Sequence, residues 1–164
     1  ITAYIQSLMN GSDLKETSRI CDDAMLNAIL SRYQRQCKEK GIDFHADIRS
    51  NAFVHLHQND LTSLFCNLLD NAVEAAEHIP DSFIELTAQK KENLPFVVLV
   101  LINSCRIMPK CDPDGYPISN KPDKTRHGFG IKSIRKVVKQ YQGDMPMYYD
   151  TDSATFHTII TLKQ

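Results

Sequence analysis

The sequence predicts an α+β fold, a two-layer sandwich in which helices cover one face of a mixed sheet. Two observations lead to this prediction. Three segments carry apolar residues at the three- and four-residue spacing of amphipathic helices, and strand-like runs lie between them. The two kinds of segment do not alternate regularly, as they would in a parallel βαβ fold, so helices layered on a mixed sheet are favoured.

The composition suits one packed domain. The chain has 164 residues, of which 42% are hydrophobic and 24% charged, and its formal net charge is −1. This balance argues against an extended basic surface for nucleic acid. The longest apolar run, 96–102, is too short to span a bilayer. The five cysteines are odd in number and form no C-x-x-C pair, so we expect neither a disulfide framework nor a zinc site.

The first 41 residues are expected to be helical. Asn10-Gly11 interrupts the pattern, Ser12 or Asp13 is the expected cap of a second helix, and Gly41 is the expected stop. Because the chain starts without Met and without a signal pattern, we expect a fragment of a longer protein. The second helix carries an apolar stripe of Leu26, Ile29, Leu30, Tyr33 and Cys37.

The middle of the chain predicts strands around one long helix. Residues 42–48 alternate between apolar and polar, which is typical of a strand, and a short strand is expected at 54–57. Residues 60–78 show the clearest helical period. Strands are predicted at 84–88 and at 96–102, the second continuously apolar, as in strands buried on both faces.

The last third begins with a long connection, residues 104–127, which contains four prolines. Connections of this length in compact domains are usually functional lids or disordered segments. A helix at 131–141 and a β-hairpin formed by 145–149 and 154–162 are expected to follow.

Two asparagines lie on the polar face of the helix predicted at 60–78. Asn67 and Asn71 are one turn apart, opposite the apolar stripe. A solvated helix face is the alternative interpretation. However, Asn is a weak helix former, and its amide oxygen suits Mg²⁺, which prefers hard oxygen ligands.

A second candidate site opens the helix that follows the long connection. Gly128 and Gly130 remove side chains where a ligand could approach the backbone, although two glycines also often only shape a loop. The N–H groups and positive dipole end of a helix suit phosphate. Four basic or titratable side chains surround these glycines, namely Lys124, Arg126, His127 and Lys132.

A third candidate is Asn103, at the end of the buried strand 96–102. An amide at the end of such a strand is well placed to hydrogen-bond a flat base at a pocket floor. A strand-end turn is the alternative interpretation.

In this order, the motifs resemble the ATP-binding domain shared by gyrase, heat-shock chaperones, histidine kinases and MutL. They are most similar to sensor histidine kinases of the branch that includes peptide-pheromone receptors. The likeness covers residues 12–162 and implies the Bergerat-type ATP-binding fold. It rests on residues 67–75 (Asn-Leu-Leu-Asp-Asn-Ala-Val-Glu-Ala), 103–105 (Asn-Ser-Cys) and 124–134 (Lys-Thr-Arg-His-Gly-Phe-Gly-Ile-Lys-Ser-Ile).

The resemblance implies a role for each motif. Asn71 would be the Mg²⁺ ligand, and Asn103 would contact the adenine amino group, where most histidine kinases have the Asp of D-x-G-x-G. Because an amide lacks that charge, nucleotide affinity is expected to be modest. Residues 104–127 would be the ATP lid. The nucleotide phosphates would lie near Lys124, Arg126, His127, Gly128, Phe129, Gly130, Ile131 and Lys132.

Asn67 separates the activities of this superfamily. The ATP hydrolases carry Glu at the matching position as a general base, and an amide cannot take a proton. A neutral imidazole needs no deprotonation before it attacks phosphorus. The resemblance therefore implies transfer of the ATP γ-phosphoryl group to a histidine, with Asn67 and Asn71 at the site. Alternatives are a serine kinase or ATPase of the same superfamily, or a catalytically weak nucleotide-binding dimerisation module.

The resemblance also implies a domain organisation and partners. Residues 1–41 would be the end of a helical dimerisation region and 42–164 the catalytic domain. An ordinary helix packed on that domain is the alternative for the first segment. None of the six histidines lies on the N-terminal helices, so the phosphoacceptor histidine is expected outside this sequence. The expected parent is a homodimeric bacterial membrane sensor that phosphorylates a response regulator and holds this domain in the cytoplasm. No nucleic-acid partner is expected.

Overall fold

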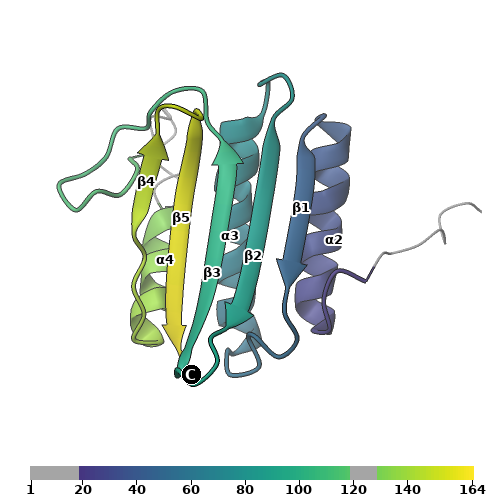
Figure 1. Ribbon diagram of the computed structural model, residues 1–164, viewed down its shortest axis with the longest axis vertical. Helices are drawn as coiled ribbons and strands as arrows, with labels where there is room; N and C mark the ends of the chain where they lie inside the picture. Colours follow the sequence, from purple (N-terminus) through teal and green to yellow (C-terminus); the bar gives the residue numbers. More distant parts are fainter. Residues whose placement is uncertain (1–18, 119–128) are drawn as a thin grey trace, which may run out of the picture.

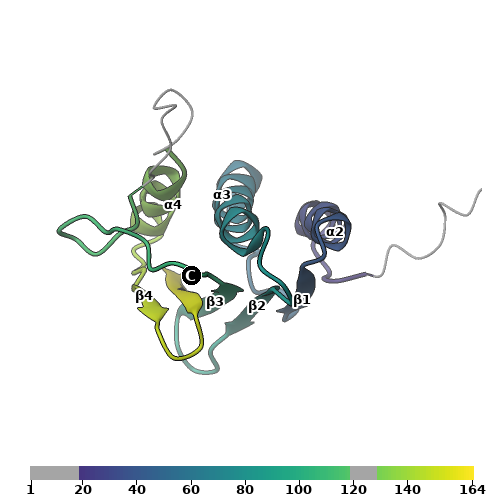
Figure 2. The ribbon, with the colours of Figure 1, turned by 90° about the horizontal axis from the view of Figure 1, so that it is seen from above.

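The computed structural model describes residues 19–118 and 129–164. Helices α2 (Ala24–Glu39), α3 (Gln58–Ala76) and α4 (Phe129–Gln140) lie side by side on one face of a five-stranded sheet (Figures 1 and 2). In the described ranges no helix covers the other face (Figure 2), so the two-layer prediction is confirmed. The strands are β1 (Asp43–Ile48), β2 (Phe83–Lys90), β3 (Phe96–Ser104), β4 (Met147–Asp150) and β5 (Thr155–Lys163).

The sheet is mixed, with the strand order β1-β2-β3-β5-β4. Among the described strands, the pair β1–β2 is parallel and the other three pairs are antiparallel. A parallel pair requires a crossover, and α3 supplies it by running from the end of β1 back to the start of β2. As a result α3 and β3 run in the same direction, and their C-terminal ends lie at the same end of the molecule (Figure 1).

Helix α2 belongs to the same hydrophobic core as the sheet. It begins after Asp23, whose side chain accepts a hydrogen bond from the Leu26 N–H at 2.7 Å. The core thus continues across the boundary expected between residues 1–41 and 42–164. A role of 1–41 in dimerisation stays a prediction, and 1–18 lie outside the described residues. The buried side chains of α2 are those of the predicted stripe, Leu26, Ile29, Leu30, Tyr33 and Cys37.

The strand expected at residues 54–57 is wrong, because this segment consists of turns. The Leu56 N–H donates to the Phe53 carbonyl at 3.0 Å, a local bond that replaces a ladder bond. Phe53 and Leu56 are buried, whereas Val54 is 73% exposed. Apolar side chains are therefore not placed on alternating faces, as a strand would require.

The first half of the expected lid is more ordered than a structureless connection. Cys111 and Pro117 form an antiparallel bridge, and between them Gly115 adopts a φ of 84°, which glycine tolerates best. The Tyr116 N–H donates to Asp112 Oδ1 at 2.8 Å and fixes the turn. Residues 119–127 of the expected lid lie outside the described residues.

None of the described helices is both long and apolar enough to cross a membrane.

Candidate functional site

The two asparagines predicted as site residues lie on one face of α3. Asn67 is half-buried and Asn71 is exposed, whereas the opposite face of the helix is buried in the core. Asn67 Nδ2 donates to the Ser63 carbonyl at 2.6 Å, one turn earlier in the helix. This bond holds the amide in place, and Asn67 Oδ1 receives no hydrogen bond from the described residues. The oxygen is therefore available to a ligand.

The first turn of α4 lies directly against these two amides. A methyl group added at Gly130 would stand 3.4 Å from Asn67 Oδ1 and 3.6 Å from Asn71 Oδ1. Those distances are ordinary contacts, and Gly130 is not among the positive-φ glycines, so neither backbone conformation nor sterics requires a glycine. Its missing side chain instead leaves space between the amides and the N-terminal turn of α4. Free N–H groups and the positive end of the helix dipole are found at such a turn.

Asn103 lies on the helix-covered face near the end of β3. It follows the alternation of Val97, Leu99 and Leu101, and it is only 4% exposed. Asn103 Nδ2 donates to the Ser104 carbonyl at 3.0 Å, while Asn103 Oδ1 accepts no hydrogen bond within the described ranges. Asn103 Oδ1 is not among the fully buried polar atoms of the described residues that lack a partner, so it remains accessible to a ligand N–H.

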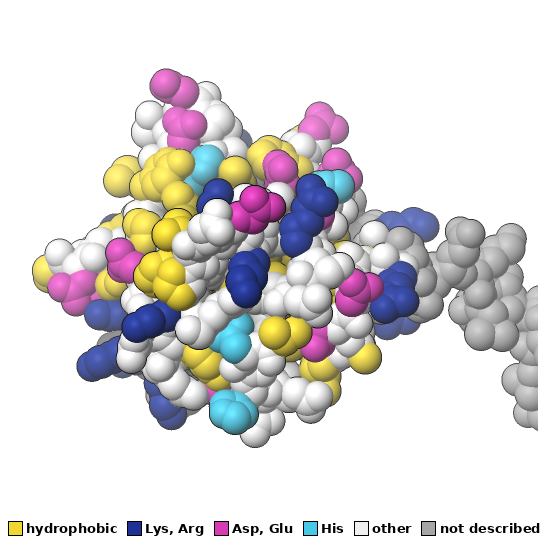
Figure 3. Space-filling model, turned by 60° about the horizontal axis from the view of Figure 1, so that its bottom comes forward, with side chains coloured by type: hydrophobic (Ala, Val, Ile, Leu, Met, Phe, Trp, Pro, Cys, Tyr) yellow, Lys and Arg dark blue, Asp and Glu magenta, His cyan; other side chains and the backbone are white. Residues whose placement is uncertain are grey.

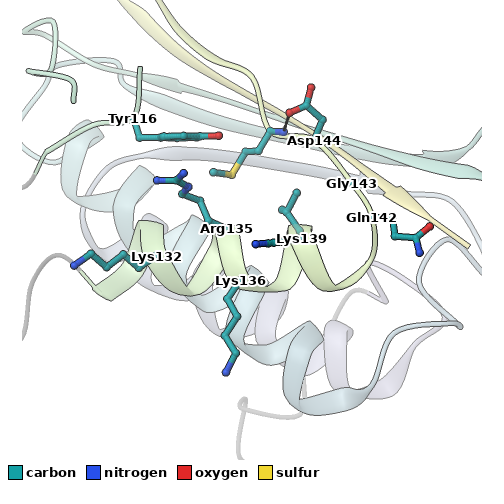
Figure 4. Close-up of a pocket in the computed structure, with 10 residues that line it drawn as sticks. Tyr116, Lys132, Arg135, Lys136, Lys139, Gln142, Gly143 and Asp144 are labelled. Carbon is teal, nitrogen blue, oxygen red and sulfur yellow. Dashed lines mark hydrogen bonds between the residues drawn. The ribbon is translucent and has the colours of Figure 1, made fainter. Parts of the chain in front are cut away.

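Lys132 is not brought to the asparagines. It follows Gly130 by two positions, which is about 200° around the helix axis. Its exposed side chain lines a groove with Tyr116 and Arg135 on another side of α4 (Figure 4). Half-buried Ile131 packs against the core. The remaining predicted site residues lie outside the described part of the chain: Lys124, Arg126, His127, Gly128 and the side chain of Phe129.

The oxygen atoms at this site fit a metal ion that is coordinated mainly by phosphate oxygens and water, with few protein ligands. The described residues contain no cluster of three or more His, Cys, Asp or Glu that could hold a metal ion. Mg²⁺ usually keeps several waters and takes few protein ligands besides phosphate oxygens. The exposed Asn71 amide could therefore be one oxygen ligand of an ion that phosphate and water otherwise coordinate.

A hydrogen bond between α2 and α3 was missed in the sequence analysis. The Tyr33 hydroxyl donates to Asp70 Oδ1 at 2.6 Å, and Tyr33 is completely buried. Burial, followed by this hydrogen bond to a carboxylate, raises the pKa of Tyr33 well above its usual range. Asp70 directly precedes Asn71, so α2 helps to hold the helix that carries the candidate site. A tyrosine within an apolar stripe was the available signal, because a buried hydroxyl needs a partner.

Solved structures that match this fold include histidine kinase catalytic domains. The chain matches the nucleotide-free catalytic domain of histidine kinase ThkA with a TM-score of 0.66 and 17% identity, covering 85% of this chain and 90% of that one. It matches the mycobacterial sensor histidine kinase MprB with a TM-score of 0.60 and 16% identity, covering 84% and 95%. The histidine kinase domain of Erythrobacter litoralis EL346 gives 0.64 and 13%, covering 98% and 71%. This chain thus has the fold of histidine kinase catalytic domains.

The sequence itself places the chain in a family. Residues 56–162 match the GHKL domain, and the chain therefore belongs to the GHKL domain family. A probable C4-dicarboxylate sensor kinase of Bacillus subtilis is 25% identical over 86% of this chain. Phytochrome B of Oryza sativa is 22% identical over 99%. The chain spans only 27% and 14% of the lengths of these two relatives.

Proposed function

We propose that this domain binds Mg-ATP between α3 and α4 and acts as the catalytic domain of a sensor histidine kinase. The observation that carries the proposal is the approach of Gly130 to the amide oxygens of Asn67 and Asn71. It brings a helix N-terminus suited to phosphate beside an oxygen suited to Mg²⁺. The GHKL family match and the fold support the same function.

Each described residue has a distinct task in this proposal. Asn71 offers the metal an oxygen, the backbone of Gly130 approaches the phosphates, and buried Asn103 accepts a hydrogen bond from the adenine amino group. Bound Mg²⁺ would neutralise charge on the phosphates. Asn67 cannot take a proton and helps to position the ligand. Catalysis therefore rests on positioning and electrostatics, which suits an acceptor that needs no general base.

The partners follow from the proposed activity. The γ-phosphoryl group would pass to a histidine on a segment outside this sequence, and then to a response regulator. The parent is proposed to be a homodimer that pairs through helices near residues 1–41. We propose a bacterial membrane sensor whose catalytic domain lies in the cytoplasm. The probable sensor kinase of Bacillus subtilis supports the bacterial sensor kinase in this proposal.

Titration calorimetry with Mg-ATP tests the binding step. Asn71→Ala should weaken binding by about tenfold to hundredfold, the size expected for one contact to a charged group. Asn59→Ala is the matched control, because Asn59 is an exposed asparagine near the start of the same helix. Absence of binding at millimolar nucleotide, or equal affinity in wild type and Asn71→Ala, would show that the proposed site is wrong.

Phosphotransfer tests the chemistry separately. The domain is mixed with labelled ATP and an upstream segment of the parent that carries the acceptor histidine. Acid-labile label on that segment is the expected result, because phosphohistidine is acid-labile. Acid-stable label on Ser or Thr would instead support a serine kinase of the same superfamily.

A further inference from the structure

A hollow on the described surface lies apart from the asparagines, on α4. It has a volume of about 650 Å³. The groove runs between α4, the turn that carries Tyr116, and residues 142–145, which follow the helix (Figure 4). Neither Asn67 nor Asn71 lines it. The groove is thus a separate feature from the proposed nucleotide site.

One face of α4 makes the groove basic. Its cations follow the spacing i, i+3, i+4 and i+7, which places them along about 10 Å of the helix. Figure 3 shows a group of Lys and Arg side chains along the lower left of the molecule, the side that carries α4 in Figure 1. The four cations are Lys132, Arg135, Lys136 and Lys139. In the described ranges no ion pair is found for the three lysines among them.

The groove also offers an ordered aromatic wall and an apolar base. The Arg135 guanidinium lies 4.1 Å from the centre of the Tyr116 ring and 3.6 Å from Asp114 Oδ2, so both side chains fix it (Figure 4). Val138 and Met145 are buried and line the base. A ligand here would meet positive charge and apolar surface together.

We propose that this groove binds an acidic segment of a partner polypeptide. Carboxylates of the segment would pair with Lys136 and Lys139, and a neighbouring apolar side chain would contact the Tyr116 ring. The length of the cation row matches about three residues of an extended chain.

Nucleic acid fits less well, because the four cations span only about 10 Å of one helix, whereas a phosphate backbone favours a wider basic surface. The net charge of −1 also supplies no wider basic surface. The proposed partner is therefore a polypeptide, and its binding does not depend on the nucleotide site.

The test measures fluorescence anisotropy of a labelled peptide in which Glu and Asp residues flank one central Leu. The protein is compared with the double variant Lys136→Glu/Lys139→Glu, which should bind about tenfold more weakly. The variant Lys38→Glu/Lys91→Glu makes the same change in net charge at exposed positions away from the groove and should bind like wild type. Mg-ATP affinity should be the same in all three proteins, since none of these lysines belongs to the proposed nucleotide site.

The outcomes separate specific binding from general attraction. A neutral control peptide has Gln and Asn in place of every Glu and Asp. The proposal is supported if Lys136→Glu/Lys139→Glu alone loses binding of the acidic peptide and the neutral peptide binds weakly to the wild-type protein. Equal weakening in both double variants overturns it, and so does equal binding of the acidic and neutral peptides. Tighter binding of a nucleic-acid duplex through the same two lysines would also overturn it in favour of a nucleic-acid surface.

Discussion

The substitution Gly130→Ala separates folding from ligand binding. Its methyl group would stand 3.4 Å from Asn67 Oδ1 and 3.6–3.7 Å from the amide atoms of Asn71, which the folded protein accommodates without a clash. Replacing a glycine inside a helix with alanine stabilises by up to about 1 kcal/mol, and less near the helix start. The same methyl fills the space that phosphate would enter. Losing one hydrogen bond to a charged group there costs about 1.5–3 kcal/mol.

Stability and affinity are therefore expected to move in opposite directions. Urea unfolding should show unchanged or higher stability for Gly130→Ala, while calorimetry should show about tenfold to hundredfold weaker Mg-ATP binding. Gly143→Ala is the contrasting variant, because its methyl would lie 1.9 Å from the Thr161 carbonyl oxygen and should disrupt the fold. Wild-type affinity in a well-folded Gly130→Ala protein would refute the reasoning, since the ligand then lies elsewhere.

Three further predictions concern stability and pH. Tyr33→Phe removes the bond to Asp70 and should lower the free energy of unfolding by about 1–2 kcal/mol in urea titrations. Asp23→Ala removes the cap of α2 and should cost about 1 kcal/mol in the same assay. Burial, and secondarily Lys90, lowers the pKa of His55. In the unfolded state His55 binds a proton near pH 6.5, whereas in the folded state it does so only at lower pH. The free energy of unfolding should therefore decrease below about pH 6.5 in wild type, and this decrease should be smaller in His55→Phe.

These three predictions fail in distinct ways. Equal stability of Tyr33→Phe and wild type would show that the hydroxyl contributes nothing to the α2–α3 contact. An unchanged Asp23→Ala protein would show that the start of α2 is held by tertiary packing alone. His45→Phe changes an exposed histidine and serves as the control for pH. If His55→Phe and His45→Phe have the same pH profile as wild type, burial of His55 does not affect stability.

Helices and strands could be predicted where one period repeats over many residues. The helix expected at 60–78 corresponds to α3 at Gln58–Ala76. It could be predicted because its apolar residues lie on a single buried face along the whole helix. The continuous apolar run 96–102 is the first part of β3 (Phe96–Ser104), which pairs on both edges. The expectation that this strand is buried on both faces was wrong, because the described helices cover only one face of the sheet (Figure 2) and alternate residues of β3 are half-buried. The short segment 54–57 was predicted wrongly, since Phe53 and Leu56 reach the core through turns that no local alternation reveals.

The site was predictable as a set of residue types but not as a geometry. The spacing of Asn67 and Asn71 fixes one face of a helix, because helical geometry is local. Their contact with Gly130 depends on how α3 and α4 pack, which the sequence pattern does not determine. For the same reason Lys132 could be counted among phosphate-facing groups, although about 200° of helix rotation directs it into the groove with Tyr116.

Chemical-shift mapping by NMR tests the central claim most directly. Mg-ADP is titrated into labelled protein, and the side-chain amides of Asn67 and Asn71 and the backbone N–H of Gly130 are followed. The account predicts that these signals, together with the Asn103 amide, shift most and saturate together. If the largest shifts fall elsewhere, such as at Arg135 and Lys139 in the basic groove, while these amides stay unchanged, the nucleotide site between α3 and α4 is contradicted.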